Sequence, residues 1–284
     1  MSFGFPDPEK RNDSTEPQET LFKTSGLKLL ASVLLTGLFS PLFAGGALRI
    51  ADASRAGIPA LNALALPLAL KENWSVTIDR VTPDEAKARL AAGRADLVVL
   101  EHGNLPDKRP RVCRMFAAEV LALYVNASNG IGSVELRDLK TLLTSARPNW
   151  RPYYPAKITD IHRYGLKSRA QGHGLAESLL GVEELAKDIF CVSSTAQAIL
   201  MAGNDPEAFG FGLLTPNVPA DVKTLEVNGV PPTPGNVASG KYLLRWRYYV
   251  LAPDSPTSPA RRFLDEMKSA SFYKELENFG FLPL

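Results

Sequence analysis

Apolar and polar positions alternate along the larger, C-terminal part of the chain in a way that predicts strands and helices in turn. Short apolar runs at 48–53 and 95–100 predict buried parallel strands, and residues 76–81 alternate as a half-buried strand does. Between these runs, residues 57–70 and 82–93 predict helices. This β-α-β-α-β order favours a parallel sheet covered by helices, with any ligand at the carboxyl ends of the strands.

The helix at 82–93 carries strong start and stop signals. Thr82 can cap its first turn, Pro83 suits the first helical position, and Glu85 completes a capping box. Gly93 is a typical residue to end it. The boundaries of this helix are therefore predicted within narrow limits.

A long apolar run at 115–125 predicts a strand that separates this first set of elements from a second one. The second set follows in chain order: a helix at 134–143, a segment at 156–165 that leads into a loop at 166–174, a helix from 175, a strand at 188–194, a helix through 201, a strand at 207–214, a turn-rich connection at 231–240, a strand at 242–253 and an amphipathic helix at 258–279. Two α/β units joined by a long strand predict two lobes.

The N-terminal segment has the order of a secretory signal. Residues 27–46 form an apolar run behind Lys23 and Lys28, which is broken by Pro41 and ends in small residues. We predict export to the periplasm, with this segment either cleaved as a signal peptide or kept as an anchor. The alternative is a buried core helix. Residues 1–26 are polar and rich in Pro, Glu and Asp, which predicts a disordered tail.

Composition narrows the class of protein. The 284 residues are 45% hydrophobic and 22% charged, as in a globular protein, and the formal net charge is only +2. Because the basic residues are scattered, nucleic-acid binding is not predicted. Cys113 and Cys191 do not form a Cys-x-x-Cys pair, and the three histidines are widely spaced, so no metal site is predicted. The two cysteines either pair with each other or remain buried free thiols.

The chain also lacks the usual signatures of enzymes. It shows no Ser-His-Asp ordering, no motif with paired carboxylates and no phosphate loop; the glycines of GFGFG lack the spacing of a nucleotide site. We therefore predict a protein that is not an enzyme and needs no cofactor. A hydrolase ranks last among the alternatives.

Several collinear motifs resemble a known family. The most specific are GVPPTPGNVASGKYLLRWRYYVLAP and ARRFLDEMKSASFYKELENFGFLPL, which make up the C-terminal part of the chain, and LAAGRADLVVLE and VLALYVNASNGIGSVELRDLKTLLT add to them. In this order they are similar to the phosphate-type (PstS-like) solute-binding proteins of ABC transporters, within the type 2 periplasmic-binding-protein superfamily. The resemblance covers most of residues 48–284.

The resemblance implies a fold and a division into lobes. The fold class is α/β: a two-lobed type 2 periplasmic-binding-protein fold, with mixed, mostly parallel sheets flanked by helices and hinge strands between the lobes. Lobe 1 would comprise residues 47–120 and 245–284, and lobe 2 would comprise residues 121–244.

It also implies a function. The chain would be an exported, monomeric receptor that captures a small anion, phosphate or a related oxyanion, between its lobes and delivers it to the membrane permease of an ABC transporter. The alternative is a protein that keeps this fold but has lost the ligand, and acts as a periplasmic interaction, sensing or scaffold protein.

In lobe 1, the family's anion site maps onto four positions. The loop after the first strand keeps Ser54 and adds Arg55, the second helix begins at Thr82, and the carboxylate after the third strand is Glu101. Backbone N–H groups at helix starts, hydroxyls and an arginine suit an anion, and a carboxylate accepts a proton from a protonated one. The other interpretations are helix caps for the hydroxyls, a cap or surface ion pair for Glu101, and a solvated side chain for Arg55.

In lobe 2, the family's motif is an arginine followed by Ser-Gly-Thr before a helix. It corresponds here to the region that holds Arg163, Ser168, Arg169 and Gln171, with Arg-Ala-Gln in place of Ser-Gly-Thr. His173, between two glycines, is either a ligand contact or a surface residue near the hinge.

Overall fold

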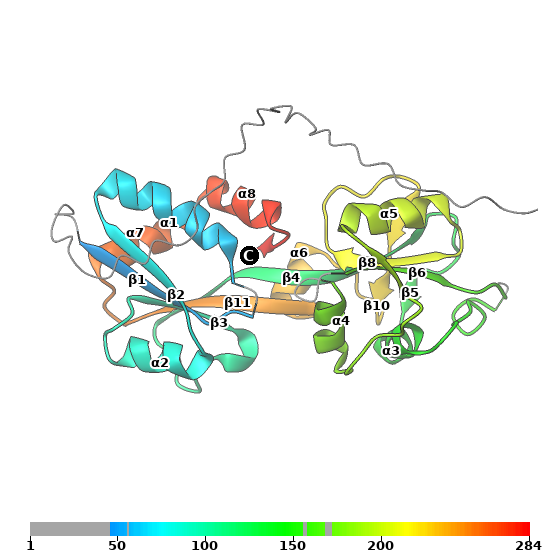
Figure 1. The fold of residues 1–284 in the computed structure, drawn as a ribbon, viewed down its shortest axis with the longest axis horizontal. Helices are drawn as coiled ribbons and strands as arrows, with labels where there is room; N and C mark the ends of the chain where they lie inside the picture. The colour runs from blue at the N-terminus through cyan, green and yellow to red at the C-terminus, as the bar shows by residue number, and fades with distance from the viewer. Residues whose placement is uncertain (1–45, 56, 156–157, 168–171) are drawn as a thin grey trace, which may run out of the picture. The chain divides into compact units, whose positions relative to one another are not determined.

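The computed structural model of the chain describes residues 46–55, 57–155, 158–167 and 172–284 (Figure 1). The predicted tail at 1–26 lies outside the described residues, as does the predicted signal segment up to residue 45. In the described ranges no helix is long and apolar enough to cross a membrane. No group of three or more histidine, cysteine or acidic side chains there could hold a metal ion.

The first lobe is built on three parallel strands in the order β2-β1-β3. The elements are β1 (Ala47–Asp52), α1 (Pro59–Glu72), β2 (Ser75–Arg80), α2 (Pro83–Ala91), β3 (Leu97–Glu101) and the short 3-10 helix η1 (His102–Asn104). Helices α1 and α2 lie on opposite sides of these strands (Figure 1), and each side has its own buried cluster. The predicted β-α-β-α-β order is confirmed.

Two long strands join the lobes. Strand β4 (Val112–Asn126) pairs antiparallel with β11 (Arg245–Ala252), and β11 pairs antiparallel with β3. Further along, β4 pairs with β8 and β9 of the second lobe. The result is one sheet of 10 strands in the order β2-β1-β3-β11-β4-β8-β6-β7, with β9 and β12 attached to β4. The sheet is mixed, with parallel outer parts and antiparallel central strands.

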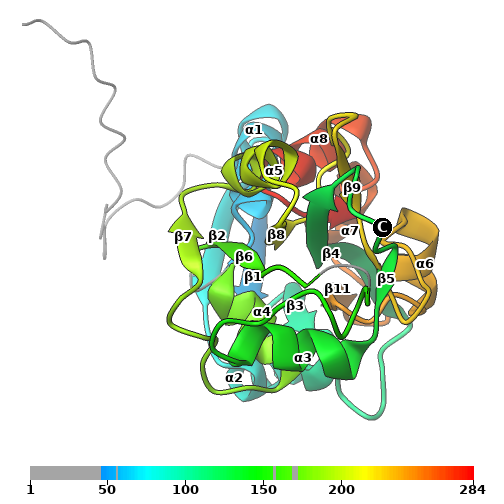
Figure 2. The ribbon, with the colours of Figure 1, turned by 90° about the vertical axis from the view of Figure 1, so that its right-hand side faces the viewer.

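The second lobe repeats the layered arrangement. Its elements are β5 (Ser133–Val134), α3 (Leu136–Thr144), β6 (His162–Leu166), α4 (His173–Leu180), β7 (Phe190–Val192), α5 (Thr195–Asn204), β8 (Ala208–Leu213), β9 (Val222–Thr224), β10 (Glu226–Val227) and α6 (Pro234–Ser239). Figure 2 shows α5 on one side of β6 and β8, with α3 and α4 on the other. Strand β6 pairs parallel with β7 and β8.

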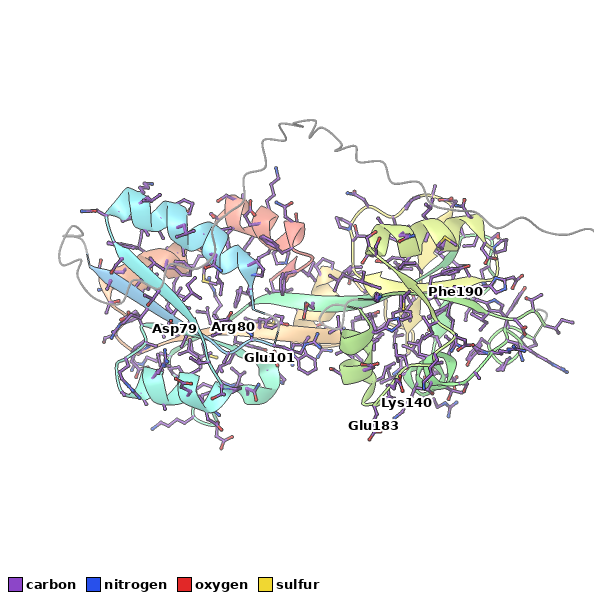
Figure 3. All side chains as sticks on the ribbon, in the orientation of Figure 1. Asp79, Arg80, Glu101, Lys140, Glu183 and Phe190 are labelled. Atoms are coloured by element: carbon purple, nitrogen blue, oxygen red, sulfur yellow. The ribbon has the colours of Figure 1, made fainter. Side chains whose placement is uncertain are left out.

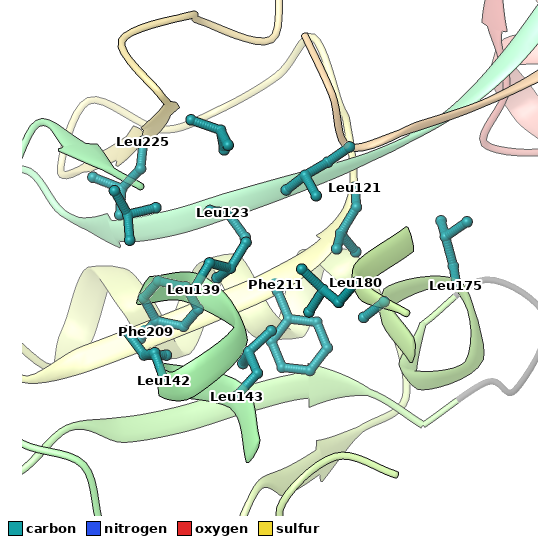
Figure 4. Close-up of a cluster of buried hydrophobic side chains, with 14 of the residues drawn as sticks. Leu121, Leu123, Leu139, Leu142, Leu143, Leu175, Leu180, Phe209, Phe211 and Leu225 are labelled. Atoms are coloured by element: carbon teal, nitrogen blue, oxygen red, sulfur yellow. The ribbon is translucent and has the colours of Figure 1, made fainter. Parts of the chain in front are cut away.

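Each lobe has its own hydrophobic core. In the second lobe, leucines of α3 and α4 pack against Phe209 and Phe211 of β8 (Figure 4). In the first lobe, α1, α7 and α8 pack on the sheet around Phe116 and Tyr248. Trp246 packs against both cores, as expected for a residue on a strand that joins the lobes. The predicted fold class is confirmed, whereas the exact lobe boundaries remain a prediction.

The structure departs from the predicted elements in the C-terminal third. The turn-rich connection at 231–240 contains α6, and the single amphipathic helix expected at 258–279 is two helices, α7 (Ser258–Glu266) and α8 (Ala270–Asn278). The break lies at Ser269, whose hydroxyl accepts a hydrogen bond from the backbone N–H of Phe272 and so caps α8. The chain ends in β12 (Leu282–Pro283), which pairs with β4. Cys113 and Cys191 are both free thiols.

Candidate functional site

The loop after β1 is fixed by a local network of hydrogen bonds. Ser54 is only 2% exposed, and both its backbone N–H and its hydroxyl donate to Oδ1 of Asp52. Arg80 of β2 bridges the same loop, donating to Oδ2 of Asp52 at 2.9 Å and to the Ser54 carbonyl at 2.6 Å. The hydroxyl of Ser54 therefore already donates a hydrogen bond within the loop, and Arg80 balances the charge of Asp52.

Arg55, the next residue, reaches from the first lobe to the second. Its Nη1 donates to the carbonyl of Gly174 at 3.2 Å and to the hydroxyl of Ser178 at 3.4 Å, both on α4. Its guanidinium carbon lies 5.4 Å from the centre of the Trp246 ring, within reach of a cation–π interaction. Its Nη2 lies 3.7 Å from Oε2 of Glu119 on β4. Arg55 therefore contacts both lobes and both strands that join them.

Two buried carboxylates lie close to Arg55. Glu101, at the end of β3, is 6% exposed and accepts a hydrogen bond from the backbone N–H of Arg55 (the residue is labelled in Figure 3). Glu119 is fully buried, and its Oε2 accepts a hydrogen bond from the Tyr248 hydroxyl at 2.5 Å. Its Oε1 has no hydrogen-bond partner among the described residues. Burial raises the pKa of Glu119, opposed by Tyr248 and Arg55 and reinforced by the charge of Glu101.

The raised pKa of Glu119 makes folding pH-dependent. Since its folded pKa lies above the unfolded value of about 4.5, stability is greatest below that value and is lost as pH rises through the folded pKa. We expect Glu119→Gln, which can still accept from Tyr248, to remove this loss. The free energy of unfolding of the variant, measured by urea denaturation between pH 4 and 8, should fall less with rising pH than that of the parent.

The exposed Glu183 supplies a matched control, because Glu183→Gln removes an acidic group without changing a buried environment (Figure 3). Its pH profile should follow that of the parent chain. An identical slope for Glu119→Gln and the parent would contradict the assignment of a raised pKa to Glu119.

A pocket of about 540 Å³ opens beside these groups, between η1, α4 and β11. Its lining comes from both lobes and from one of the joining strands: Glu101, His102, Gly103, Asn104, Ser178, Leu179, Leu243, Arg245, Trp246 and Arg247. It lies where β3 ends, the edge of the sheet at which the sequence predicts a ligand. We take this pocket, together with Arg55, as the candidate site.

Two of the arginines that line the pocket, Arg245 and Arg247, form no ion pair with the described residues. Among the described residues no carboxylate lies within 4.0 Å of the guanidinium of Arg245 or Arg247. Burial and then the charge of Arg247 lower the pKa of Arg245. Burial, followed by Arg247, Arg109 and Arg245, lowers the pKa of His102, which favours its neutral form. This environment suits an anion.

The structure brings together three of the predicted site residues, Ser54, Arg55 and Glu101. Thr82 instead caps α2, accepting a hydrogen bond from the backbone N–H of Glu85 at 3.3 Å. Thr82 therefore acts as a helix cap, which is a role that the sequence also allows. Its contact with a ligand remains a prediction.

Arg163 lies inside the second lobe. It is 2% exposed, and its Nη1 donates to the carbonyls of Leu142 and Ser145 at 2.6 and 2.9 Å, while its Nη2 pairs with Asp188. The guanidinium group is therefore engaged in hydrogen bonds that stabilise the second lobe.

The remaining predicted residues of the second lobe are less informative about the site. Ser168, Arg169 and Gln171 lie outside the described residues. His173 begins α4 and stacks on Phe211 with ring centres 5.5 Å apart. Its role as a ligand contact remains a prediction.

Sequence reasoning did not single out Glu119, Arg245 or Arg247. A signal for them was available: two arginines flank a tryptophan in an otherwise apolar strand, and one glutamate interrupts the longest apolar strand. Charged residues inside such strands are rare unless they face a partner or a cavity. Trp246 packs against both cores and also lies under the guanidinium of Arg55.

The fold and the cleft site together define the class of protein, one with the type 2 periplasmic-binding-protein fold. Among solved structures, the chain matches an ABC-type phosphate transport receptor from Vibrio cholerae with a TM-score of 0.63 and 20% identity, over 83% of this chain and 99% of that one. It matches PstS from Borrelia burgdorferi with a TM-score of 0.66 and 18% identity, over 84% and 98% of the two chains.

A curated relative agrees with this class. The chain is 26% identical to the phosphate-binding protein PstS of Bacillus subtilis over 201 residues, which are 68% of this chain and 64% of that protein. It thus spans less than two thirds of the length of that relative. No protein-family profile matches the chain. The resemblance to the phosphate-type solute-binding proteins is confirmed, and the relatives are named as binding or transport proteins, not as enzymes.

Proposed function

We propose that the chain is a solute-binding receptor that captures a small anion, such as phosphate, between its two lobes for an ABC-type uptake system. The observation that carries the proposal is the pocket lined by both lobes, with Arg245 and Arg247 in its wall and no carboxylate paired with either among the described residues. The relative in Bacillus subtilis is a phosphate-binding protein, which supports an anionic ligand. A scaffold that has lost its ligand is not favoured.

The geometry supports a simple mechanism. Guanidinium groups would supply charge-assisted hydrogen bonds to the anion, and the Glu101 carboxylate would accept a hydrogen bond from a ligand that carries a proton. Because the pocket walls belong to both lobes, a bound ligand adds contacts that exist only when the lobes are close, and so favours that state. The change of angle would be taken up by β4 and β11.

The partners follow from the same proposal. A receptor with a bound ligand would present its lobes to the membrane permease of an ABC transporter, outside the cytoplasmic membrane, and would do so as a monomer. Export would depend on residues 27–46, cleaved as a signal peptide or kept as an anchor. The lobes would comprise residues 47–120 with 245–284, and residues 121–244.

A thermal-shift series with phosphate, sulfate, molybdate and small organic anions tests the proposal. A ligand that binds only the folded chain stabilises it by about 2.7 kcal/mol at a concentration 100 times its Kd, so the Tm should rise with at least one anion. Arg55→Met removes a cation that contacts both lobes and should reduce the shift. Arg151→Met, at an exposed position, should leave it unchanged.

Two results would contradict the proposal. One is a Tm that stays constant with every anion at concentrations far above micromolar. The other is a Tm shift that depends equally on Arg55 and on Arg151, because it would indicate a general effect of ionic strength and not a site.

A further inference from the structure

We infer that the outer face of α1 lies in the lipid surface of the membrane that holds the chain. This outer face is formed by Ala63, Leu66, Pro67 and Leu70. The inference rests on the part of the proposed function that keeps residues 27–46 as an anchor. It concerns a surface that does not line the candidate anion pocket, so the two can be tested separately.

Helix α1 is apolar on its outer face as well as on its inner one. The inner face packs into the core of the first lobe through Leu61, Leu64 and Leu68. On the outer face, Leu66 is 63% exposed and Leu70 is 78% exposed. A surface helix of a globular domain normally carries polar side chains toward water, and a helix that is apolar all round is normally covered. The outer face of α1 therefore has the composition of a contact surface.

The exposed leucines form a continuous patch. Residues four apart on a helix are neighbours on its surface, so Leu66 and Leu70 lie side by side, and Ala63 and Pro67 extend the patch. No side chain of α1 before Lys71 is charged. Single exposed apolar residues are common in soluble proteins, whereas a contiguous apolar patch marks a surface that meets a partner protein or a membrane.

The position of the patch indicates which of the two it meets. Leu70 is in the last turn of α1, and just after the helix ends the backbone N–H of Ser75 donates to the carbonyl of Gly46 at 3.0 Å. Gly46 is both the first residue that the structure describes and the last residue of the predicted anchor. Because no linker separates the anchor from the lobe, an anchored chain holds this end of α1 next to the bilayer.

The charges around the patch favour lipid over a strongly charged protein partner. The groove between α1 and α8, beside the patch, is lined by Lys71, Glu266 and Glu275, so it carries both signs and no strong net charge. Lys71 follows Leu70 directly, and its long side chain can reach the headgroup phosphates while its methylene groups stay along apolar surface. An uncharged apolar patch with a lysine at its end suits the boundary between headgroups and acyl chains.

Quenching of tryptophan emission by brominated lipid tests the inference. The full-length Leu70→Trp chain is reconstituted into phosphatidylcholine vesicles, and the parent chain gives the background from its own tryptophans. We expect the added indole to emit at shorter wavelength than an exposed indole does, and to be quenched by bromine on the lipid. Quenching should be strongest for bromine atoms near the headgroups, because an interfacial apolar face lies about 5–10 Å into the boundary between headgroups and acyl chains.

Phe190→Trp is the matched control, because Phe190 is a comparably exposed apolar residue, at 62%, in the second lobe (Figure 3). Its indole should stay unquenched, and equal quenching at residues 70 and 190 would overturn the inference. No quenching at residue 70 would overturn it too; emission at short wavelength would then mean that another part of the chain or a second copy covers the face. Loss of residues 1–45 during export, measured as the mass of the exported chain, would have the same consequence. In each case the thermal-shift series with anions would still decide the proposed function.

Discussion

Replacing Arg163 by methionine is expected to lower the free energy of unfolding by about 2–6 kcal/mol, because two enclosed carbonyls would each lose their donor at a cost of about 1–3 kcal/mol. The Arg163 side chain is enclosed in the second lobe, where it donates to the carbonyls of Leu142 and Ser145 and pairs with Asp188. Methionine fills a similar volume but leaves both carbonyls without their donor. Urea denaturation followed by circular dichroism measures the difference.

The variant Asp188→Asn separates the parts of this network. It keeps the bonds from Arg163 to the two carbonyls. It removes a charge that is 43% exposed and one of the two oxygens that accept from Arg163 and from the backbone N–H of Arg147, so its effect should be smaller. The sequence places Arg163 in an anion site, and the same variant tests that prediction. An Arg163→Met chain that is as stable as the parent but no longer binds an anion would show that the residue acts on the ligand.

Gly165→Ala is expected to lower the free energy of unfolding by about 1–3 kcal/mol, as overpacking of a core does. A Cβ atom at residue 165 would overlap the ring of Phe211 and lie 2.7 Å from Nε2 of His173. Since His173 begins α4, the strain would also reach the turn whose Gly174 carbonyl accepts from Arg55. Both the Tm and the affinity for an anion should fall.

Gly132→Ala is the matched control, because a Cβ atom there meets nothing within 4 Å. The two variants should differ clearly in their urea midpoints. Equal midpoints would mean that Phe211 and His173 can move aside at little cost, and that the packing under α4 is looser than the structure indicates.

The sequence predicted the framework of the first lobe well, for local reasons. The start of α2 at Thr82 and its end near Gly93, which has a φ of 65°, follow from capping and backbone conformation that depend on a few neighbouring residues. The break at Ser269 was missed because the helical periodicity of apolar residues continues across it. The short strands β9, β10 and β12 were missed because two or three residues carry no periodicity.

The site could be predicted only in part. Ser54, Arg55 and Glu101 were predicted because the resemblance places the family's anion site on the loop after the first strand and on the carboxylate after the third. Whether a polar group there is free or engaged depends on partners far away in the sequence, such as Arg80 for the loop at Ser54. The same limit explains why Arg247 was missed. The alternation of residues along a strand predicts which side chains share a face of the sheet, but it does not predict that a pocket lies beside one of these faces.

The passage of β4 from one core into the other has a consequence for how the chain denatures. Its hydrogen bonds run to β11 and β12 at one end and to β8 and β9 at the other. If one core unfolded alone, β4 would stay a strand only where its partners remain folded. The other core would then contain a central strand that is ordered over only part of its length. The two lobes are therefore expected to unfold together in one cooperative transition, although their hydrophobic cores are separate.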